Sequence, residues 1–232
     1  MRCNLKGIIF DLDGTLTLVR FRTGDSLHRQ YVQKLKEGLI LMFQIPEEIV
    51  RDLRLLSEIR EVTVSYLERK NATMNEIKSV LSFIDSVIDE FSHKELTSSK
   101  LDPDAIYVLS RLKHKGLKIG LFTFSSRKVA LRTLRKYNIE EYFDAIVTRT
   151  DVIHAKPNPL HLLATINSLN LEPKDVGVVS DSLMDIKSGR EIGVRFTMLI
   201  LRKSTIPYPT VYSPDFRVKK LRDILNIIDF NE

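Results

Sequence analysis

Residues 5–15 read LKGIIFDLDGT, and this stretch decides how the rest of the chain is interpreted. The run GIIF at 7–10 is apolar at every position, which is typical of a central parallel strand that is buried on both faces. Asp11 ends this strand, Asp13 follows two residues later, and the chain is expected to turn at Gly14. We therefore expect a buried strand at 5–11 that delivers two carboxylates to one edge of a sheet.

The segment between about residues 25 and 96 has the spacing of helices. Its clearest stretch is 77–91, where apolar residues recur three and four positions apart. Thr73 and Glu76 form a capping box just before that stripe, and Pro46 with two following glutamates suits the first turn of an earlier helix. This segment is expected to fold as about three packed helices.

Strands and helices alternate after Pro103. Helices are expected at about 103–115, 126–137, 158–170, 183–191 and 217–228, and strands at 117–123, 143–148, 175–181 and 194–201. Such alternation implies right-handed crossovers and a doubly wound, Rossmann-like parallel sheet. The predicted fold class is therefore α/β, with a core made of residues 1–16 and 98–232 and a helical cap domain inserted at 17–97.

Composition excludes several other classes of protein. The chain has 232 residues, of which 43% are hydrophobic and 28% charged, as in ordinary globular domains. No apolar run approaches the roughly 18 residues that span a membrane, and the first residues do not resemble a signal peptide. The single cysteine, Cys3, excludes an internal disulfide framework and a cysteine-rich zinc site. A cytoplasmic protein without a membrane partner is expected.

The charge pattern gives little support to a nucleic-acid partner. There are 36 Lys and Arg against 30 Asp and Glu, a net charge of +6, and the two signs are interleaved. A modest basic excess favours small anionic molecules more than nucleic acid, because nucleic-acid modules add stacking aromatics or a recognised motif. Neither a P-loop nor GxGxxG is present, and the histidines show no paired ligand spacing. A monomer or a homodimer is expected.

The ends of the predicted strands carry the residues that suit chemistry. Ligands of open parallel sheets bind at the carboxyl ends of the strands. The polar residues expected at this edge are Asp11, Asp13, Thr123, Ser125, Ser126, Lys156, Ser180, Asp181 and, one helical turn further on, Asp185. Carboxylates, hydroxyls and one ammonium group are therefore expected to converge there.

The order and spacing of these residues resemble the haloacid dehalogenase superfamily, especially its phosphoglycolate-phosphatase-like branch. FDLDGTLT at 10–17 resembles the first motif of that family, Thr123 the second, KPNP at 156–159 the third and SDSLMD at 180–185 the fourth. The resemblance extends through the whole sheet portion of the chain.

This resemblance implies a role for each matching residue. Asp11 would attack phosphorus to form an aspartyl-phosphate, and Asp13 would protonate the leaving oxygen and then activate water. Thr123 would donate a hydrogen bond to a phosphoryl oxygen, and Lys156 would neutralise the nucleophile and the phosphate. These four residues are the predicted catalytic set, with Thr123 and Lys156 also binding substrate.

The resemblance also implies a magnesium site, which suits a hard cation that needs few carboxylates. The carboxylates of Asp11 and Asp181 and the backbone carbonyl of Asp13 would hold the ion. Asp185 would orient the shell around it, although it could instead have a purely structural role at the start of its helix.

Asp13 narrows the reaction type, because dehalogenases of the family lack an aspartate there. The predicted function is magnesium-dependent hydrolysis of a small phosphate monoester, such as a phosphoglycolate-like compound or a sugar or nucleotide phosphate. One alternative is an intramolecular phosphotransferase similar to β-phosphoglucomutase, and another is a non-catalytic binding module. The expected partner is a small phosphorylated metabolite.

Some positions depart from the family pattern or have simpler explanations. Ser180 stands where relatives most often have glycine, and residues 18–22 lack an acidic residue common in the branch. Arg20 is a candidate for binding a second anionic group of the substrate, although arginines in such linkers more often face solvent. Ser125 and Ser126 are candidates for phosphate binding or, more simply, for capping the next helix. Among the histidines, only His154 is expected near the site, with a loop role.

Overall fold

The core of the computed structural model is one parallel sheet, and the structure describes residues 5–18, 25–95, 99–201 and 213–230. Six strands run in the order β5-β4-β1-β6-β7-β8, and every pair of neighbours is parallel. Their bounds are Gly7–Phe10 for β1, Lys118–Thr123 for β4, Ala145–Thr148 for β5, Val176–Ser180 for β6, Phe196–Ile200 for β7 and Phe216–Val218 for β8. The predicted fold class is confirmed.

Strand β1 lies inside the sheet because its side chains are apolar in both directions. Ile8 and Phe10 belong to the hydrophobic cluster on one face, whereas Ile9 belongs to the cluster on the other. All three are fully buried. Since β1 pairs with both β4 and β6, the residues that follow it are held near the middle of the sheet edge.

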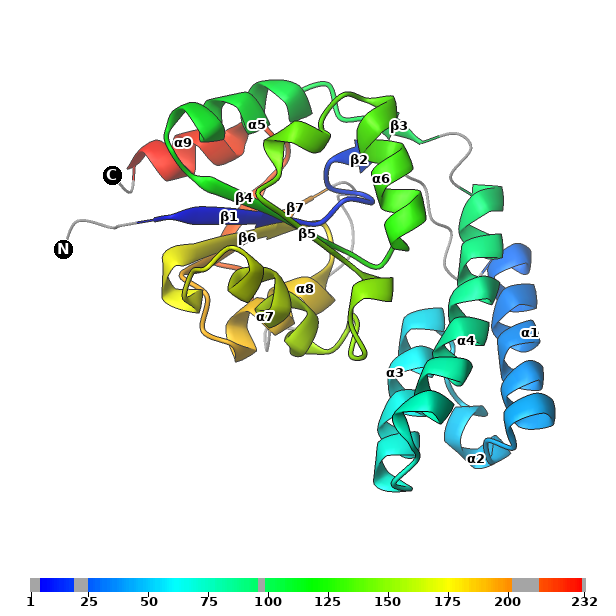
Figure 1. Cartoon of the computed structure of the whole chain (residues 1–232). Coiled ribbons are helices and arrows are strands. Elements are labelled where there is room, and N and C mark those ends of the chain that lie inside the picture. Colours follow the sequence, from blue (N-terminus) through cyan, green and yellow to red (C-terminus); the bar gives the residue numbers. More distant parts are fainter. Residues whose placement is uncertain (1–4, 19–24, 96–98, 202–212, 231–232) are drawn as a thin grey trace.

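Helices cover both faces of the sheet (Figure 1). On one face lie α5 (Ala105–His114), α6 (Arg127–Lys136) and α9 (Asp223–Phe230). On the other face lie α7 (Pro159–Ser168) and α8 (Leu183–Glu191). The helices on the two faces exclude water from the strands, so a ligand can reach the sheet only at the ends of its strands.

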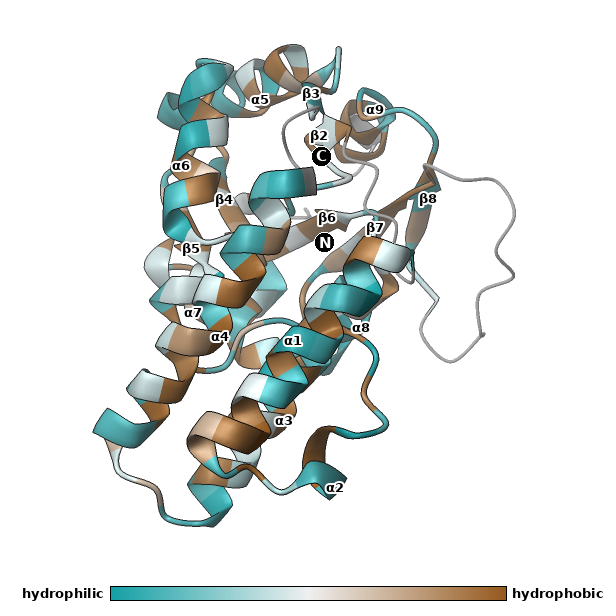
Figure 2. Cartoon of the chain, turned by 90° about the vertical axis from the view of Figure 1, so that its right-hand side faces the viewer, coloured by the Kyte–Doolittle hydropathy of each residue, from teal (hydrophilic) through white to brown (hydrophobic). Residues whose placement is uncertain are grey.

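The inserted segment forms a helical cap at the carboxyl edge of the sheet. Its helices are α1 (Ser26–Phe43), the single turn α2 (Glu47–Val50), α3 (Leu56–Arg69) and α4 (Met74–Glu95). The stripe predicted at 77–91 is buried between them, and Figure 2 shows apolar and polar residues alternating around these helices. The Thr73 hydroxyl accepts from the Glu76 amide at 3.3 Å, and Glu76 accepts from the Thr73 amide at 2.6 Å, so the predicted capping box is confirmed.

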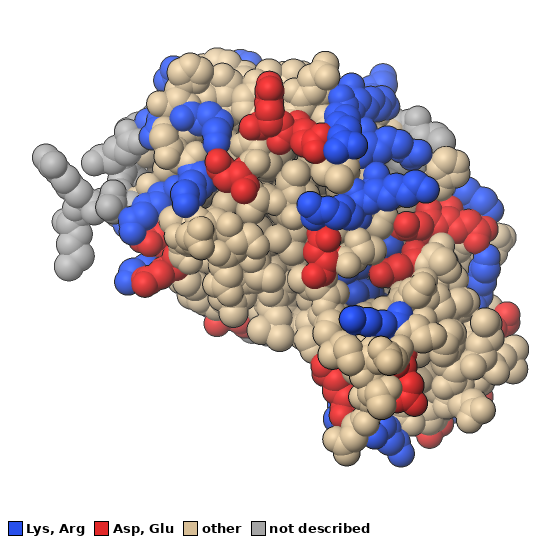
Figure 3. All heavy atoms as spheres, viewed as in Figure 1, with Lys and Arg blue, Asp and Glu red and all other residues tan. Residues whose placement is uncertain are grey.

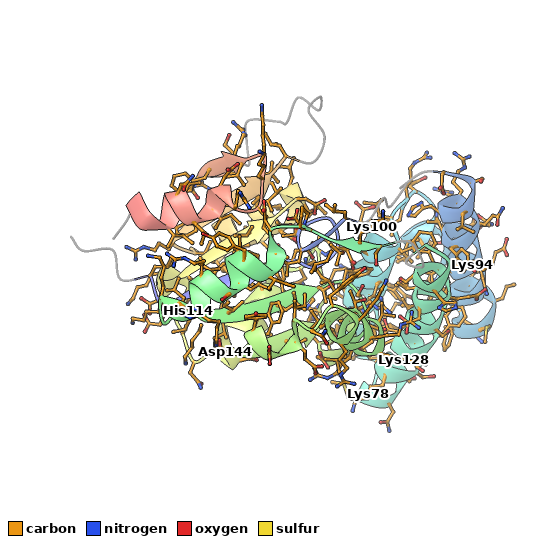
Figure 4. The ribbon with its side chains drawn as sticks, turned by 90° about the horizontal axis from the view of Figure 1, so that it is seen from above. Lys78, Lys94, Lys100, His114, Lys128 and Asp144 are labelled. Atoms are coloured by element: carbon orange, nitrogen blue, oxygen red, sulfur yellow. The ribbon has the colours of Figure 1, made fainter. Side chains whose placement is uncertain are left out.

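Two short strands join the cap to the core. β2 (Thr17–Leu18) pairs with β3 (Lys100–Leu101) in antiparallel register, so the chain enters and leaves the cap side by side. In Figure 4, Lys100 lies between the core and the end of α4 that carries Lys94. The cap helices lie within the segment predicted for the cap, whereas the division at residues 16 and 98 stays a prediction.

The prediction of one helix over 217–228 is wrong at its start. Phe216–Val218 forms the edge strand β8, paired with β7, and the helix begins only at Asp223. Val218 is buried in the same cluster as Leu221 and Leu225, so it satisfied the helical spacing. Residues 216–218 form a strand because they pair with β7, as in the partners Ile200 and Val218. These partners are far apart in sequence, so local spacing does not indicate the pairing.

Charges of both signs are interspersed on the face shown in Figure 3. Helix α6 contributes basic residues at Arg127 and Arg135, which pair with Asp151 and Glu140. Within the described ranges, no helix is long and apolar enough to cross a membrane.

Candidate active site

A cavity of about 320 Å³ lies between the carboxyl edge of the sheet and the cap. The core contributes Asp11, Asp13, Thr123, Phe124, Ser125, Lys156, Pro157, Asp181, Ser182, Met184 and Asp185 to its lining. The cap contributes His28, Leu55, Leu56, Ser57, Ile88, Phe91 and Ser92. The described site residues expected from the sequence therefore line one cavity.

Lys156 connects two buried carboxylates. Its Nζ donates to Asp11 Oδ1 at 2.6 Å and to Asp185 Oδ2 at 2.8 Å. The same ammonium lies 3.7 Å from the centre of the Phe122 ring, close enough for a cation–π contact. These contacts fix a positive charge beside the nucleophile predicted at Asp11.

Burial and charge set the protonation of this pair in opposite ways. Burial raises the pKa of Asp11 well above its ordinary value, and the charges of Asp185, Asp181 and Asp13 add to that rise while Lys156 opposes it. Burial alone would lower the pKa of Lys156, but Asp11 and Asp185 outweigh it and the pKa is raised. Lys156 is therefore held as a cation, and Asp11 depends on nearby positive charge to ionise.

Asp13 is held by two hydroxyl groups. Ser125 Oγ donates to Asp13 Oδ2 at 2.7 Å, and Thr17 Oγ1 donates to Asp13 Oδ1 at 3.3 Å. Burial raises the pKa of Asp13, although both hydrogen bonds and Lys156 oppose the rise. A carboxyl group with a raised pKa suits a residue that gives up a proton and then takes one back.

The serines after β4 have different roles. Ser126 caps α6, because its side chain accepts from the Val129 amide at 3.5 Å. Ser125 instead points at Asp13, so the simpler explanation as a helix cap holds for Ser126 alone. Thr123 is fully buried, and its hydroxyl accepts from the Ser125 amide at 3.1 Å, which leaves its own proton for another acceptor.

Asp181 packs against the turn at Gly14. A Cβ at residue 14 would lie 2.1 Å from Asp181 Oδ2, and the φ angle of 91° there also favours glycine. The Asp181 amide donates to Thr15 Oγ1 at 3.0 Å, and Thr15 Oγ1 donates to Asp11 Oδ2 at 3.4 Å. Thr15, to which the sequence assigned no role, thus connects the segments that carry both carboxylates.

This donor set fits a hard cation such as Mg²⁺. The carboxylates of Asp11 and Asp181 both face the cavity, and the close approach of Asp181 to Gly14 places it beside the turn that contains Asp13. Among the described residues, no group of three or more His, Cys, Asp or Glu side chains is arranged so that it could hold a metal ion. Mg²⁺ usually keeps several waters and one or two carboxylates, so two carboxylates with a carbonyl oxygen are enough.

Asp185 contacts side chains of the core. Besides the bond from Lys156, its Oδ2 accepts from Ser180 Oγ at 2.7 Å, and Ser180 Oγ also accepts from the Ser182 amide at 3.0 Å. The serine that departs from the family pattern therefore fixes the partner of Lys156. A role for Asp185 in orienting a metal shell stays a prediction.

The expectation about the histidines is wrong. His161 lies beside Lys156: its Nδ1 accepts from the Lys156 amide at 3.3 Å, so its Nε2 donates to the Val147 carbonyl at 3.2 Å. Burial lowers the pKa of His161 to about 3, which keeps it neutral. His28 lines the cavity as well. Nothing in the spacing of these histidines indicated either position.

His154, in the core, contacts two glutamates of the cap. Its Nδ1 lies 2.8 Å from Glu61 Oε1 and its Nε2 lies 3.0 Å from Glu68 Oε1, both on α3. Burial would lower the pKa of His154, but the hydrogen bond to Glu61 and the charges of both glutamates outweigh it and raise the pKa. Asn158, two residues after Lys156, also donates to Glu61, at 2.6 Å.

Two buried arginines cross the boundary between cap and core in opposite directions. Arg60 of α3 donates to the carbonyl oxygens of Arg149, Val152 and Ile153 in the core, at 2.8 to 3.1 Å. Arg149 reaches Asp85 and Asp89 on α4 and the Phe124 carbonyl in the loop after β4. Sequence reasoning missed both, because neither belongs to a motif.

Arg20, which the sequence predicts to bind substrate, lies outside the described residues, as does Cys3. Its binding role therefore stays a prediction.

A parallel sheet with two aspartates, a threonine and a lysine at its carboxyl edge, covered by a helical cap, has the side chains that phosphoryl transfer needs. A family model described as haloacid dehalogenase-like hydrolase matches residues 5–193, and the chain belongs to this family. The resemblance identified from the sequence motifs is confirmed, and the enzyme is a phosphatase.

Individual relatives agree with this family. Pyrophosphatase PpaX of Bacillus thuringiensis (strain Al Hakam) is 27% identical over 226 residues, which cover 95% of both chains. The crystal structure of a HAD phosphatase from Thermococcus onnurineus is 24% identical, with a TM-score of 0.57 and coverage of 96% of this chain and 97% of that one. A predicted phosphoglycolate phosphatase from Haemophilus somnus 129pt is 20% identical, with a TM-score of 0.61 and coverage of 97% and 98%. These two structures support the fold.

Proposed function

We propose that this phosphatase hydrolyses a small phosphate monoester in a magnesium-dependent reaction, through an aspartyl-phosphate on Asp11. The observation that supports this most is the placement of Asp11 in the lining of the cavity between sheet and cap, with Lys156 Nζ 2.6 Å from one of its carboxylate oxygens. A carboxylate beside a fixed cation, near a second carboxyl group with a raised pKa, has the groups that two-step phosphoryl transfer needs.

In the first step, a carboxylate oxygen of Asp11 forms a bond to phosphorus while the bond from phosphorus to the ester oxygen breaks. Asp13 gives its proton to that oxygen, so the alcohol leaves neutral. In the second step, Asp13 takes a proton from water, whose oxygen attacks the same phosphorus. The bond to Asp11 then breaks, which restores its carboxylate and releases inorganic phosphate.

The surrounding side chains hold charges and protons in place. Lys156 offsets the negative charge that accumulates on Asp11 and the phosphoryl oxygens, and Thr123 donates its free proton to one of them. Ser125 keeps the Asp13 carboxyl oriented through the 2.7 Å hydrogen bond. Bound Mg²⁺, held by Asp11, Asp181 and the carbonyl of Asp13, would supply a further positive charge for the phosphoryl oxygens.

Phosphate release with and without magnesium, run beside Asp11→Asn, tests this proposal. The panel contains phosphoglycolate, a hexose phosphate, a mononucleotide, pyrophosphate and an aryl phosphate. Asp52→Asn is the matched control, because the Asp52 side chain is 89% exposed and does not line the cavity. We expect magnesium-dependent release that is lost in Asp11→Asn and kept in Asp52→Asn.

The other outcomes separate the alternatives. Release that survives Asp11→Asn would exclude the aspartyl-phosphate. Formation of a phosphate isomer of the hexose phosphate, without free phosphate, would indicate the intramolecular phosphotransferase. The cytoplasmic location and the monomeric or homodimeric state belong to the same proposal; they rest on composition and are tested by fractionation and by light scattering.

A further inference from the structure

The cavity has two chemically different walls. The core side holds the charged groups, at Asp11, Asp13, Lys156, Asp181 and Asp185. The described cap side holds Leu55, Leu56, Ile88 and Phe91, with the neutral polar groups of Ser57 and Ser92 and the ring of His28. Among these cap residues none is Lys, Arg, Asp or Glu. A phosphoryl group on the charged wall would therefore direct its alcohol part toward an apolar wall.

The core continues this apolar surface on the side of α8. Met184, in the first turn of α8, lines the cavity and is 37% exposed, and Phe124 and Pro157 also line it. Ligand sites are lined predominantly by apolar and aromatic side chains, with a few polar groups that orient the ligand. An alcohol part held between cap and core would therefore meet apolar side chains from both.

Within the described lining, the Lys and Arg side chains are confined to the core side of the cavity. Among the described lining residues, Lys156 alone is a Lys or Arg, and its ammonium group already contacts Asp11 and Asp185. The cap lysines Lys78 and Lys94 are exposed on its outer surface (Figure 4) and do not line the cavity. His28 packs edge-on against Phe91, with ring centres 5.7 Å apart. A second anionic group would thus be buried against apolar side chains, which is costly without a paired cation.

We propose that the site selects phosphate monoesters whose alcohol part is uncharged and largely apolar, with Leu56, Ile88 and Phe91 as specificity-determining residues. This inference rests on the proposed function. The cavity volume of about 320 Å³ is near the lower end of small-molecule sites. This volume fits an alcohol part the size of a short alkyl chain or a single aromatic ring, and the apolar cap wall disfavours a carboxylate, a second phosphate or a polyhydroxyl sugar of the same size.

A matched pair of aryl esters tests this specificity. Phenyl phosphate and 4-carboxyphenyl phosphate differ by one carboxylate on the ring, and this carboxylate makes the phenol a slightly better leaving group. Chemical reactivity alone therefore favours the carboxylated ester, whereas the apolar wall disfavours it. We expect kcat/KM of the full chain with magnesium to be at least about tenfold higher for phenyl phosphate. Phosphoglycolate and pyrophosphate should also rank below phenyl phosphate.

A charge placed in the cap wall should reverse this preference. Ser57 is half-buried in the first turn of α3 and lines the cavity, so Ser57→Lys introduces an ammonium group opposite the core side. We expect the ratio of the two kcat/KM values to move toward the carboxylated ester by about tenfold or more. The matched control is Leu41→Lys, because Leu41 is 80% exposed on α1 and adds the same charge outside the cavity. It should leave the ratio unchanged.

The failure of this inference can be told from the failure of the proposed function. Equal or higher kcat/KM for 4-carboxyphenyl phosphate or pyrophosphate overturns the inference while supporting a phosphatase. If Arg20→Ala removes that preference, the cation comes from the segment before α1, and the inference is overturned as well. If no ester releases phosphate, the proposed function fails and the inference fails with it.

Discussion

Replacing Arg149 by methionine tests whether the cap is held to the core by buried ionic contacts. Arg149 is fully buried in η3 (Arg149–Asp151), and its Nε donates to Asp85 Oδ1 at 2.8 Å. Its Nη1 donates to the Phe124 carbonyl at 2.8 Å, and its Nη2 contacts Asp89. Methionine keeps most of the aliphatic stem but removes every one of these donors.

The expected loss of free energy of unfolding depends on which contacts the partners of Arg149 keep after the substitution. Removing one member of a buried ion pair costs about 3–5 kcal/mol, because the other charge stays buried. Asp89 is 35% exposed and is rehydrated, while Asp85, 18% exposed, keeps the guanidinium of Arg60 at 3.5 Å. The Phe124 carbonyl loses a donor, which costs about 1–3 kcal/mol if no water replaces it. Because these costs overlap, we expect a total loss near the lower limit, about 3 kcal/mol.

Urea denaturation followed by circular dichroism measures this loss. With a slope of about 2 kcal/mol per molar urea, the midpoint should fall by about 1.5 M. The control is Arg127→Met, whose side chain is 51% exposed and pairs with Asp151 at 2.9 Å on the surface. It should cost less than about 1 kcal/mol. Equal losses for the two variants would refute the argument, because burial would then not decide the strength of the contact.

Further predictions concern the catalytic groups and the cap contacts. Lys156→Met should lower kcat/KM by about a thousandfold. Burial raises the pKa of Asp11 and the charge of Lys156 lowers it, so without Lys156 the acidic limb of the pH profile should move to higher pH. An acidic limb that stays at the same pH would contradict this. His154 has a raised pKa in the folded state, so its imidazolium stabilises the fold below the unfolded pKa of about 6.5, and this contribution is lost as pH rises through the folded pKa. The stability difference between wild type and His154→Gln should be about 1 kcal/mol at most and shrink between about pH 6 and about pH 8, as measured by denaturation at both. Gly14→Ala places a Cβ 2.1 Å from Asp181 Oδ2 and should raise the magnesium concentration needed for half-maximal activity by about tenfold, whereas Gly116→Ala, with a φ of 76° and nothing within 4 Å, should leave it unchanged.

The sheet and the position of the site could be predicted because they follow from local patterns. The apolar run at 7–10 is buried on both faces, and a parallel sheet brings the ends of its strands to one edge whatever the loops do. Asp11, Thr123, Lys156 and Asp181 therefore line one cavity although they are far apart in sequence.

The remaining features depend on contacts that have no local signal. Arg60 bonds to backbone carbonyl oxygens up to 93 positions away, and any residue type supplies such an acceptor. His161 likewise bonds to two backbone groups, the amide of Lys156 and the carbonyl of Val147. Because every residue type has such backbone groups, no sequence motif indicates these contacts. Strands β2 and β3 have two residues each, which is too short for a periodicity of two to be recognised.

The pairing of β2 with β3 has a consequence for how the cap segment is inserted into the core. Leu18 and Lys100 are partners in the register, so the chain leaves the core and returns to it at neighbouring points. A tight turn of about two residues is enough to join such antiparallel neighbours. Replacing the segment between them by such a turn would interrupt no strand of the six-stranded sheet, but it would also remove the cap partners of the buried Arg149. The same hydrolytic edge, left uncovered in this way, would become accessible to phosphate groups on macromolecules.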